Sequence, residues 1–388
     1  MDKEMKVFKV LYVLSATYMG GATISFLALL EGMKKRGVEC VVTITDNNPE
    51  FIALLDKLDV KHYIVPVAFH SHSNINGFVS LLKYPYRMLK KFVRWHISIN
   101  SIEEIARKEK VDFIHTNVGP IHAGYEAARR LGIHHVWHIR EYGDKEFHIH
   151  EWPSTESFKR TLAKDYTIHI TQDIRRHNKL EDNPKAYVVY NGVRKHDDVH
   201  FDKDKENYFL CASQMGRSKG HIDAIRVFSV FYKKHPTWKL RIIGRGGEKG
   251  YIEELKKLIK MGSVEDAVTL EGHKSNVTDY MRKAKALLVP SYNEGFGRMT
   301  AEASFAGTMV IGRNTGGTLE IMEKTGGIMF SNDDEFLAAM EKVASMSESE
   351  YKEKVLKSQR IAQELYAEES YVENVYKVYI GVLNDRKK

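Results

Sequence analysis

The chain has 388 residues, enough for two domains of ordinary size, and a formal net charge of +8. Its contents of 43% hydrophobic and 28% charged residues are typical of a globular soluble protein. No segment approaches the ~18–20 consecutive apolar residues that cross a bilayer, which argues against a helical transmembrane protein.

Two features indicate the cellular compartment. The N-terminal stretch MDKEMKVFKVLYVLS has a short apolar part that alternates like a strand and lacks a small-residue cleavage site, so it does not resemble a signal peptide. Cys40 and Cys211 lie in separate apolar runs, which is typical of buried thiols in a reducing cytosol rather than of a disulfide framework. We therefore expect a cytoplasmic protein.

The positive charge lies mainly in the N-terminal half of the chain. Residues 1–195 hold 29 Lys and Arg against 22 Asp and Glu, whereas the remaining residues hold 30 against 29. A basic half favours an anionic partner such as a phosphorylated substrate, a phospholipid surface or a nucleic acid. Scattered, solvated lysines are the alternative. Neither a stacking platform of aromatic residues nor a reading helix is evident, so we expect no nucleic-acid binding.

Apolar strands alternate with helical segments along the first half. Val7–Leu14 predicts a buried strand, Ser15–Thr23 a turn, and the residues up to about Lys35 a helix. Gly20 and Gly21 at the start of this helix let the backbone approach a ligand closely. Further strands are predicted at Gly37–Ile44, Tyr63–Val67, Asp112–His115, His135–Ile139, Thr167–Ile170 and Tyr187–Val189. The alternation predicts a doubly wound α/β domain.

The segment Leu81–Ile97 (LLKYPYRMLKKFVRWHI) predicts an amphipathic helix, which Pro85 restricts to the residues that follow it. At about 100° per residue, its basic face carries Lys83, Arg87, Lys90 and Arg94, with Lys91 at the margin. Its apolar side carries Leu81, Leu82, Met88, Leu89, Phe92, Val93 and Trp95. Such a helix can lie peripherally on the anionic inner face of the cell membrane. The alternative is that its apolar side packs on the sheet and its basic side is solvated.

His138 stands at the end of a predicted strand within Ile133–Asp144 (IHHVWHIREYGD), where open α/β sheets bind ligands. Arg140 and Glu141 follow at once and are candidates for lining the same site. Other histidines nearby are His134, His135, His148 and His150. Their spacing matches no zinc pattern, so we expect no metal site here.

A second domain is predicted after the highly charged Arg194–Glu206, which has no apolar face and is the expected interdomain linker. A strand at Tyr208–Ala212 then runs into SQMGRSKG, where Lys219 precedes a glycine and a helix. Trp238–Gly247 is a strand ending in a glycine turn whose spacing is not G-x-G-x-x-G, so we expect no dinucleotide site. Val268–His273 is a further strand and loop.

The segment Pro290–Glu320 combines two glycine turns with two carboxylates. A strand leads into the turn Asn293–Gly297 and then a helix, which places Glu294 in the turn and Glu302 in the first helical turns. The next strand ends in a second glycine turn, Asn314–Thr318, whose backbone N–H groups can cradle a phosphate. Carboxylates for sugar hydroxyls and amides for a pyrophosphate are the groups that a nucleotide sugar requires.

This segment resembles the donor-site signature of the retaining glycosyltransferases of family 4, in the glycosyltransferase group 1 superfamily. Their pattern S-x-x-E-G-F-G-x-x-x-x-E-A appears here as Ser291–Ala303, and their Gly-Gly-x-x-E turn as Gly316–Glu320. The family also places a Gly-Gly in the first strand–helix turn, a histidine at a strand end in the first domain, and an Asn-Gly-Val at that domain's end. All three are present, so the resemblance covers most of the chain.

The resemblance implies a role for each matching residue. Glu294 would hold hydroxyls of the transferred sugar, and Glu302 would hold the ribose. Lys219 would bind the pyrophosphate, and His138 would orient the sugar or the acceptor. Other donor contacts are implied for Gly20, Gly21, Gly272, His273, Gly295, Phe296, Gly297, Gly316, Gly317, Thr318 and Leu319.

Two positions depart from the family pattern. The proline of the family's G-x-P-V-I strand is Met309, which should matter little because that proline shapes a loop. The arginine that the family often has five residues before the phosphate-binding lysine is Gln214. Arg217 is a candidate to supply the missing positive charge from a different position.

The resemblance further implies the GT-B fold, in which two doubly wound domains face each other across a cleft. Residues 1–195 would bind the acceptor, residues 196–370 the nucleotide sugar, and residues 371–388 would return to the first domain. The enzyme would transfer a hexose or N-acetylhexosamine from a UDP-sugar to a saccharide or polyprenyl-linked acceptor of cell-surface polysaccharide. The configuration at the anomeric carbon would be retained, and no metal or other cofactor would be needed. Relatives that work on lipid-linked acceptors favour membrane association through Leu81–Ile97.

Two alternatives remain open. A nucleotide-sugar 2-epimerase shares this architecture but needs acid/base carboxylates that the sequence does not identify. It would release free UDP and epimerised sugar without an acceptor. A catalytically silent sugar-binding protein would bind the donor without turnover, which the intact pair Glu294 and Glu302 disfavours.

Overall fold

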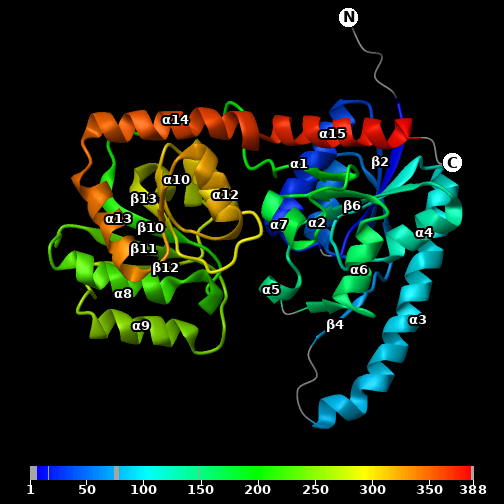
Figure 1. Cartoon of the computed structure of the whole chain (residues 1–388), viewed down its shortest axis with the longest axis horizontal. Helices are drawn as coiled ribbons and strands as arrows, with labels where there is room; N and C mark the ends of the chain where they lie inside the picture. The colour runs from blue at the N-terminus through cyan, green and yellow to red at the C-terminus, as the bar shows by residue number, and fades with distance from the viewer. Residues whose placement is uncertain (1–6, 16, 74–77, 148, 386–388) are drawn as a thin grey trace, which may run out of the picture. The chain divides into compact units, whose positions relative to one another are not determined.

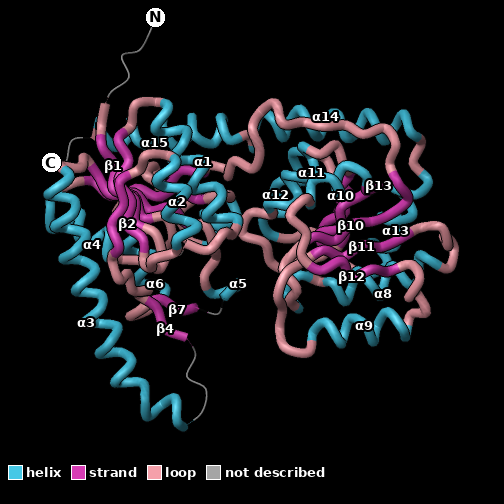
Figure 2. The backbone as a smooth tube through the Cα atoms, turned by 180° about the vertical axis from the view of Figure 1, so that it is seen from behind, coloured by secondary structure: helices cyan, strands magenta, loops and turns pink. Residues whose placement is uncertain are grey.

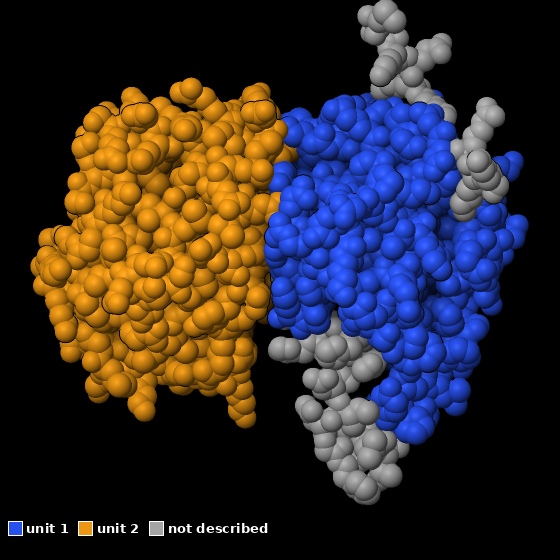
Figure 3. All heavy atoms as spheres, in the orientation of Figure 1, with its two compact units in different colours: residues 1–192, 368–388 blue, residues 193–367 orange. Residues whose placement is uncertain are grey.

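The computed structural model describes residues 7–15, 17–73, 78–147 and 149–385. The chain divides into two compact units (Figure 3). Unit 1 comprises residues 1–192 and 368–388, and unit 2 comprises residues 193–367. Each unit has its own parallel sheet, so the predicted architecture of two doubly wound α/β domains is confirmed.

Unit 1 is built on a seven-stranded sheet with the order β3-β2-β1-β5-β6-β8-β9. These strands are β1 Lys9–Val13, β2 Glu39–Ile44, β3 Lys61–Ile64, β5 Phe113–Thr116, β6 His134–Ile139, β8 Tyr166–His169 and β9 Ala186–Val188. Val10 and Tyr12 of β1 enter one apolar core, whereas Leu11 and Val13 enter another. Successive side chains of a strand point to opposite faces, so an unbroken apolar run gives a strand that is buried on both sides.

Helices lie around the sheet of unit 1 (Figures 1 and 2). They are α1 Gly21–Lys35, α2 Pro49–Lys57, α3 Phe78–Glu109, α4 Ala123–Leu131, α5 Asp144–Phe147, α6 Thr155–Leu162, α7 Gln172–His177 and α15 Glu368–Asn384. Although α15 follows unit 2 in the sequence, its Tyr371, Val375 and Tyr379 belong to the core of unit 1 beside α1. The Tyr379 hydroxyl lies 2.8 Å from Nδ1 of His115. The prediction that the final helix returns to the N-terminal domain is confirmed.

Helix α3 has two halves with different surroundings. Its second half packs Ile99, Ile102 and Ile105 into the core of unit 1. Its first half extends away from the sheet (Figure 1). The expectation that Pro85 restricts the regular helix is wrong, because α3 runs through this residue. Pro85 is exposed, so water can bind the carbonyl that lacks an N–H partner.

Unit 2 contains a six-stranded parallel sheet with the order β12-β11-β10-β13-β14-β15 (Figure 2). Its strands are β10 Glu206–Ala212, β11 Lys239–Ile243, β12 Val268–Gly272, β13 Ala284–Val289, β14 Met309–Arg313 and β15 Ile328–Phe330. Its helices are α8 His221–Tyr232, α9 Tyr251–Met261, α10 Val277–Lys283, α11 Arg298–Phe305, α12 Gly316–Thr325, α13 Asp333–Ser345 and α14 Glu348–Tyr366. Phe209 and Cys211 of β10 face one core, and Tyr208 and Leu210 face the other.

Both cysteines are buried free thiols, as predicted. Cys40 lies in β2 and Cys211 in β10, so they sit in the cores of different units. Burial raises the pKa of each thiol to about 12. A thiol with a raised pKa stays protonated at neutral pH and is a poor nucleophile.

The expectation that Arg194–Glu206 forms an interdomain linker is wrong, because this segment packs within unit 2. The His200 amide donates to the Phe305 carbonyl over 3.0 Å, and the Gln359 side chain donates to the His200 carbonyl over 2.8 Å. Phe201 packs against the apolar core. One aromatic side chain and a few backbone hydrogen bonds therefore hold a segment whose charged composition resembles a linker.

Candidate functional site

Three loops of unit 2 meet at the carboxyl ends of its central strands β10, β13 and β14. The Tyr292 amide, in the loop after β13, donates to the Ser218 carbonyl in the loop after β10 over 2.9 Å. The Gly317 amide, after β14, donates to the backbone carbonyl of Glu294 over 2.8 Å. Backbone hydrogen bonds therefore connect the loop that carries Lys219, the Glu294 turn and the second glycine turn.

Lys219 and Glu294 form an ion pair at this junction. Lys219 ends a short 3-10 turn that begins at Arg217, and its Nζ donates to Oε1 of Glu294 over 2.7 Å. Both side chains are about three-quarters buried. The next residue, Gly220, has a φ of +71°, and a Cβ there would lie 2.7 Å from the carbonyl carbon of Pro290. Only glycine permits this approach, which places the lysine beside the Glu294 turn.

The second glycine turn opens α12 and holds N–H groups suited to an anion. A Cβ on Gly317 would lie 2.5 Å from the carbonyl carbon of Phe296, so the two turns pack backbone against backbone. The amides of Gly317 and Leu319 donate to protein carbonyls. Within the described part of the chain, those of Gly316 and Thr318 have no acceptor. Of the four amides expected to bind phosphate, these two remain available at the positive end of a helix dipole.

Glu302 lies in α11 and is engaged by two arginines. Its Oε1 accepts from Nε of Arg298 over 2.8 Å, and its Oε2 lies 3.7 Å from Nη2 of Arg194. The glutamate side chain is only 12% exposed, so the pairing neutralises a largely buried carboxylate. A ribose role for Glu302 stays a prediction, and it requires that the carboxylate accept hydroxyl groups in addition to these arginines.

Arg217 is directed to α9. Its guanidinium lies 2.5 Å from Glu254 and 3.3 Å from Glu248. Arg217 is therefore not a free positive charge that could replace the family arginine absent at Gln214, because two carboxylates already pair with its guanidinium. At the end of β12, Gly272 accepts the Gly244 amide over 2.9 Å, and Nε2 of the adjacent His273 lies 3.1 Å from Nη2 of Arg245.

Two sites of the predicted set lie in unit 1. Gly20 is the N-cap of α1, Gly21 is its first residue, and the nearest neighbour of a Cβ on Gly20 would be the ring of Tyr18. His138 lies in β6 and is fully buried. These residues belong to a different unit from Lys219 and Glu294.

His138 belongs to a buried polar network around Arg140. The Arg140 guanidinium donates to the amide oxygens of Asn117 and Asn191, over 3.0 and 2.7 Å, and to the Tyr371 hydroxyl over 2.8 Å. It also donates to Nδ1 of His138 over 3.4 Å. Burial, followed by the charge of Arg140, lowers the pKa of His138 well below its usual range. Because arginine only donates, the neutral imidazole carries its proton on Nε2, which has no hydrogen-bond partner among the described residues.

The neighbouring histidines have structural partners. Nδ1 of His135 lies 2.7 Å from Asp165, and Nε2 of His134 lies 2.7 Å from the carbonyl of Asp385. His148 lies outside the described residues, and so does the side chain of His150. Among the residues that the structure describes, no three His, Cys, Asp or Glu side chains are grouped as metal ligands would be.

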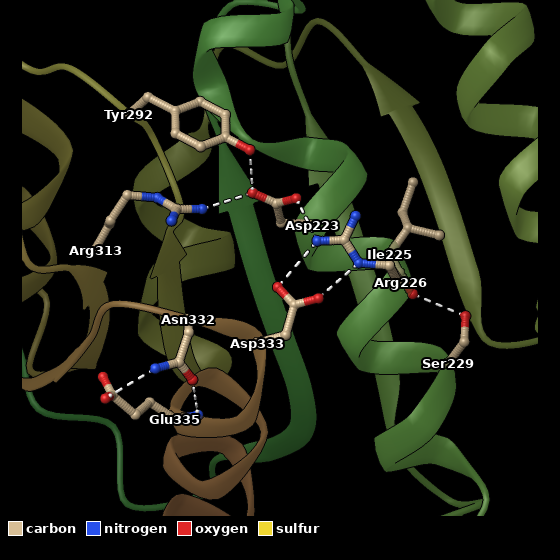
Figure 4. Close-up of polar contacts among 9 residues, drawn as sticks. All are labelled: Asp223, Ile225, Arg226, Ser229, Tyr292, Arg313, Asn332, Asp333 and Glu335. Carbon is tan, nitrogen blue, oxygen red and sulfur yellow. Dashed lines mark hydrogen bonds and ion pairs between the residues drawn. The ribbon is translucent and has the colours of Figure 1, made fainter.

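One polar cluster next to the Lys219 loop has no counterpart among the predicted site residues. Asp223 in α8 binds Tyr292 of the loop after β13 and Arg313 at the end of β14 (Figure 4). These two residues are separated from Asp223 by 69 and 90 positions, so no local spacing in the sequence relates them. The only signal was indirect, because Tyr292 lies inside the segment of the glycosyltransferase signature.

Family models match both units. Residues 19–196 match the model of Glycosyltransferase Family 4, and residues 193–361 match the model of Glycosyl transferases group 1. The boundary between the two matches lies next to Gly192, where the structure divides the chain.

Two relatives illustrate the sequence similarity. The chain is 23% identical over 372 residues to an uncharacterized 42.6 kDa protein in the cps region of Klebsiella pneumoniae, covering 86% of this chain and 92% of the relative. It is 30% identical over 186 residues to the O-antigen chain mannosyltransferase RfbU of Salmonella typhimurium, which covers 47% of this chain and 49% of the relative.

The fold is that of a solved GT-B glycosyltransferase. The structure of the Anabaena protein HepE in complex with UDP aligns with a TM-score of 0.76, covering 96% of this chain and all of that one. The sequences are only 15% identical, so this likeness establishes the fold alone.

Proposed function

Because the chain belongs to glycosyltransferase family 4 within the group 1 glycosyl transferases, we propose that it is a retaining, metal-independent hexosyltransferase. Its donor is a nucleotide diphosphate sugar, UDP-linked, that carries a hexose or an N-acetylhexosamine. Its acceptor is a saccharide or lipid-linked saccharide of a cell-surface polysaccharide. The relatives named as a protein in a cps region and as an O-antigen chain mannosyltransferase support this acceptor class, and the UDP complex of the Anabaena protein supports the nucleotide.

One observation carries the donor assignment. The Lys219–Glu294 pair and the unpaired amides of Gly316 and Thr318 meet at the carboxyl edge of one sheet. The cation and the amides suit a diphosphate, and the carboxylate suits sugar hydroxyls. Binding of phosphate oxygens to Lys219 would leave Glu294 free to accept hydroxyl groups of the transferred sugar.

The proposed transfer proceeds on one face of the anomeric carbon. The bond from this carbon to the β-phosphate oxygen breaks as the bond to the acceptor oxygen forms, and the departing diphosphate takes the acceptor proton. Lys219 and the two amides stabilise the negative charge that develops on the diphosphate. His138 is neutral and its Nε2 proton has no partner among the described residues, so its proposed role is to donate to and orient a substrate hydroxyl rather than to act as general base.

Membrane association is a second part of the proposal, and the exposed side of α3 favours it. Leu89, Phe92, Val93 and Ile97 are each about half exposed or more. They therefore do not pack on the sheet as the alternative for this helix requires. Leu81, Leu82 and Lys83 of the predicted amphipathic segment lie outside the described side chains. Among the described residues, no helix is long and apolar enough to cross a bilayer, so the contact that we propose is peripheral.

A panel of nucleotide sugars tests the donor assignment. UDP-, GDP-, ADP- and dTDP-sugars are added without metal, and the melting temperature is measured. We expect a UDP-sugar to raise it in the wild type but not in Glu294→Ala, which should keep the wild-type fold and lose transfer. Transfer at the wild-type rate by Glu294→Ala would contradict the assignment. Release of an epimerised sugar without acceptor would instead support the epimerase alternative.

A further inference from the structure

A buried carboxylate lies in the first turn of the helix that follows Lys219. Asp223 is in the first turn of α8, and its side chain is only 6% exposed. Oδ2 accepts from the Tyr292 hydroxyl and from Nη2 of Arg313, each over 2.6 Å (Figure 4). A carboxylate this buried needs such donors, because an unpaired charge in the interior is strongly destabilising.

Tyr292 links this carboxylate to the two loops beside Glu294. Its backbone amide donates to the Ser218 carbonyl over 2.9 Å, one residue before Lys219. Its backbone carbonyl accepts from the Thr315 hydroxyl over 3.4 Å, one residue before the available amide of Gly316. Tyr292 is thus bound to Asp223 through its hydroxyl and contacts both neighbouring loops through its backbone.

Arg313 holds the same loop from the other side. Its Nε donates to the Pro290 carbonyl over 2.9 Å, and its guanidinium carbon lies 4.3 Å from the centre of the Tyr292 ring. The carbonyl of Pro290 is also the group against which Gly220 packs, next to Lys219. Together these contacts fix Pro290 and Tyr292, which lie in the loop just before Glu294.

We propose that Asp223, Tyr292 and Arg313 are positioning residues that hold Lys219 and Glu294 in the geometry that binds the nucleotide sugar. This inference rests on the proposed donor site. The hydrogen bond with Asp223 raises the pKa of Tyr292, so the phenol remains a donor at neutral pH. None of the three needs to touch the substrate, because each acts through the loop.

The opposite side of Asp223 provides a matched control. Oδ1 accepts from Arg226 over 2.7 Å, and Arg226 forms two further bonds with Asp333, over 2.7 and 2.9 Å (Figure 4). Arg226 and Asp333 are each about half exposed, and their hydrogen bonds and ion pairs in the described structure join them to each other and to Asp223, not to the loop of Tyr292. Asp333→Asn therefore weakens the same network on the side away from Lys219.

The test compares Tyr292→Phe with Asp333→Asn in the full chain. UDP is the probe, its Kd is measured by calorimetry, and backbone hydrogen exchange is followed by mass spectrometry. We expect Tyr292→Phe to weaken UDP binding about tenfold, the effect of losing one hydrogen bond to a buried charge. Exchange should rise in residues 217–220 and 290–297. Asp333→Asn should leave the UDP affinity and these segments unchanged.

A second variant, measured together with its melting temperature, separates a positioning role from a general loss of stability. Arg313→Lys keeps the positive charge but loses the bond from Nε to Pro290, so it should reproduce the effects of Tyr292→Phe at an unchanged melting temperature. Equal UDP affinity and equal exchange in Tyr292→Phe and wild type would overturn the inference. Absence of UDP binding by the wild type would instead count against the proposed donor, while the exchange data would still decide whether Tyr292 fixes the loops.

Discussion

Nζ of Lys219 lies 2.7 Å from Oε1 of Glu294, although the two residues come from loops 75 positions apart. Both side chains retain about a quarter of their exposure, so solvent screening keeps the contribution of this pair to folding stability small. The pair is better explained by the proposed binding of a nucleotide sugar, in which the cation and the carboxylate would each meet a different part of the donor.

Replacing Lys219 by Ala should weaken binding of the nucleotide diphosphate by 10- to 100-fold, or about 1.4–2.8 kcal/mol, because one charge-assisted contact is lost. Lys219→Arg should retain part of the affinity for UDP, since the positive charge remains but a planar guanidinium replaces the compact ammonium group. Calorimetric titration with UDP measures both variants. Lys260→Ala, in the exposed last turn of α9, is the control and should bind UDP like the wild type.

Gly317→Ala should disturb the donor site through the backbone. The added Cβ would lie 2.5 Å from the carbonyl carbon of Phe296, so the two glycine turns must separate. We expect a loss of stability of about 1–3 kcal/mol, as for other overpacked sites, together with a loss of UDP binding. Gly326→Ala at the other end of α12 has a φ of +77° but no atom within 4 Å. It should cost about 1 kcal/mol without changing UDP affinity.

The proposed membrane association through α3 would depend on basic and on apolar residues, which can be changed separately. Lys90→Glu/Arg94→Glu should reduce flotation with anionic vesicles more than tenfold, since each basic residue contributes about 1 kcal/mol near such a surface. Leu89→Ser/Val93→Ser should reduce flotation at high salt as well as at low salt, because salt does not screen the insertion of apolar side chains. Val230→Ser/Met261→Ser, at exposed apolar positions of unit 2, is the control. Unchanged flotation in both α3 variants would show that the helix does not contact the membrane.

Acid should destabilise unit 1 through His122. Burial lowers the pKa of this side chain to about 3, whereas its unfolded value is about 6.5. The unfolded state therefore binds more protons between these values, and the stabilising contribution is complete above pH 6.5 and falls as the pH drops towards 3. At pH 5 about 2 kcal/mol is lost relative to pH 7.5.

His122→Phe should show a smaller loss of stability on acidification. The ring packs against Trp137 and Phe158, and its Nε2 has no hydrogen-bond partner among the described residues, so an apolar ring suits the site. Urea unfolding at pH 7.5 and at pH 5 measures the difference. Equal losses in the variant and the wild type would contradict the assigned role of His122.

The strand, turn and helix of Pro290–Glu320 could be predicted from the sequence because the information in this segment is contiguous. The glycines, Glu294 and Glu302 follow one another along a strand, a turn and a helix, so their spacing alone places them at one edge of the sheet. The strands of both sheets were likewise recognisable from apolar runs, although the short β15 and the antiparallel pair of β4 (Ser71–Ser73) with β7 (Ile149–Glu151) were not.

Tertiary contacts account for what the sequence could not predict. The pairing of Glu302 with Arg194 and the direction of Arg217 towards Glu254 depend on which donors and acceptors reach each other after folding. The Asp223 network joins a helix with a loop and a strand that are distant in sequence. Helix α3 continues through Pro85 because its exposed position lets water replace the missing hydrogen bond, which no local propensity indicates.

The return of α15 to unit 1 determines when each unit can complete its fold during synthesis. Residues 193–367 are continuous, so unit 2 can close as soon as they leave the ribosome. The core around β1 still lacks Tyr371 and Tyr379 at that moment, although its strands were made first. At a synthesis rate of 5–20 residues per second, roughly 10–40 s separate the synthesis of the sheet of unit 1 from that of α15. During this time the apolar surface that α15 will cover is exposed to chaperones or to aggregation. A truncation within α15 therefore damages the part of the protein that the ribosome made first.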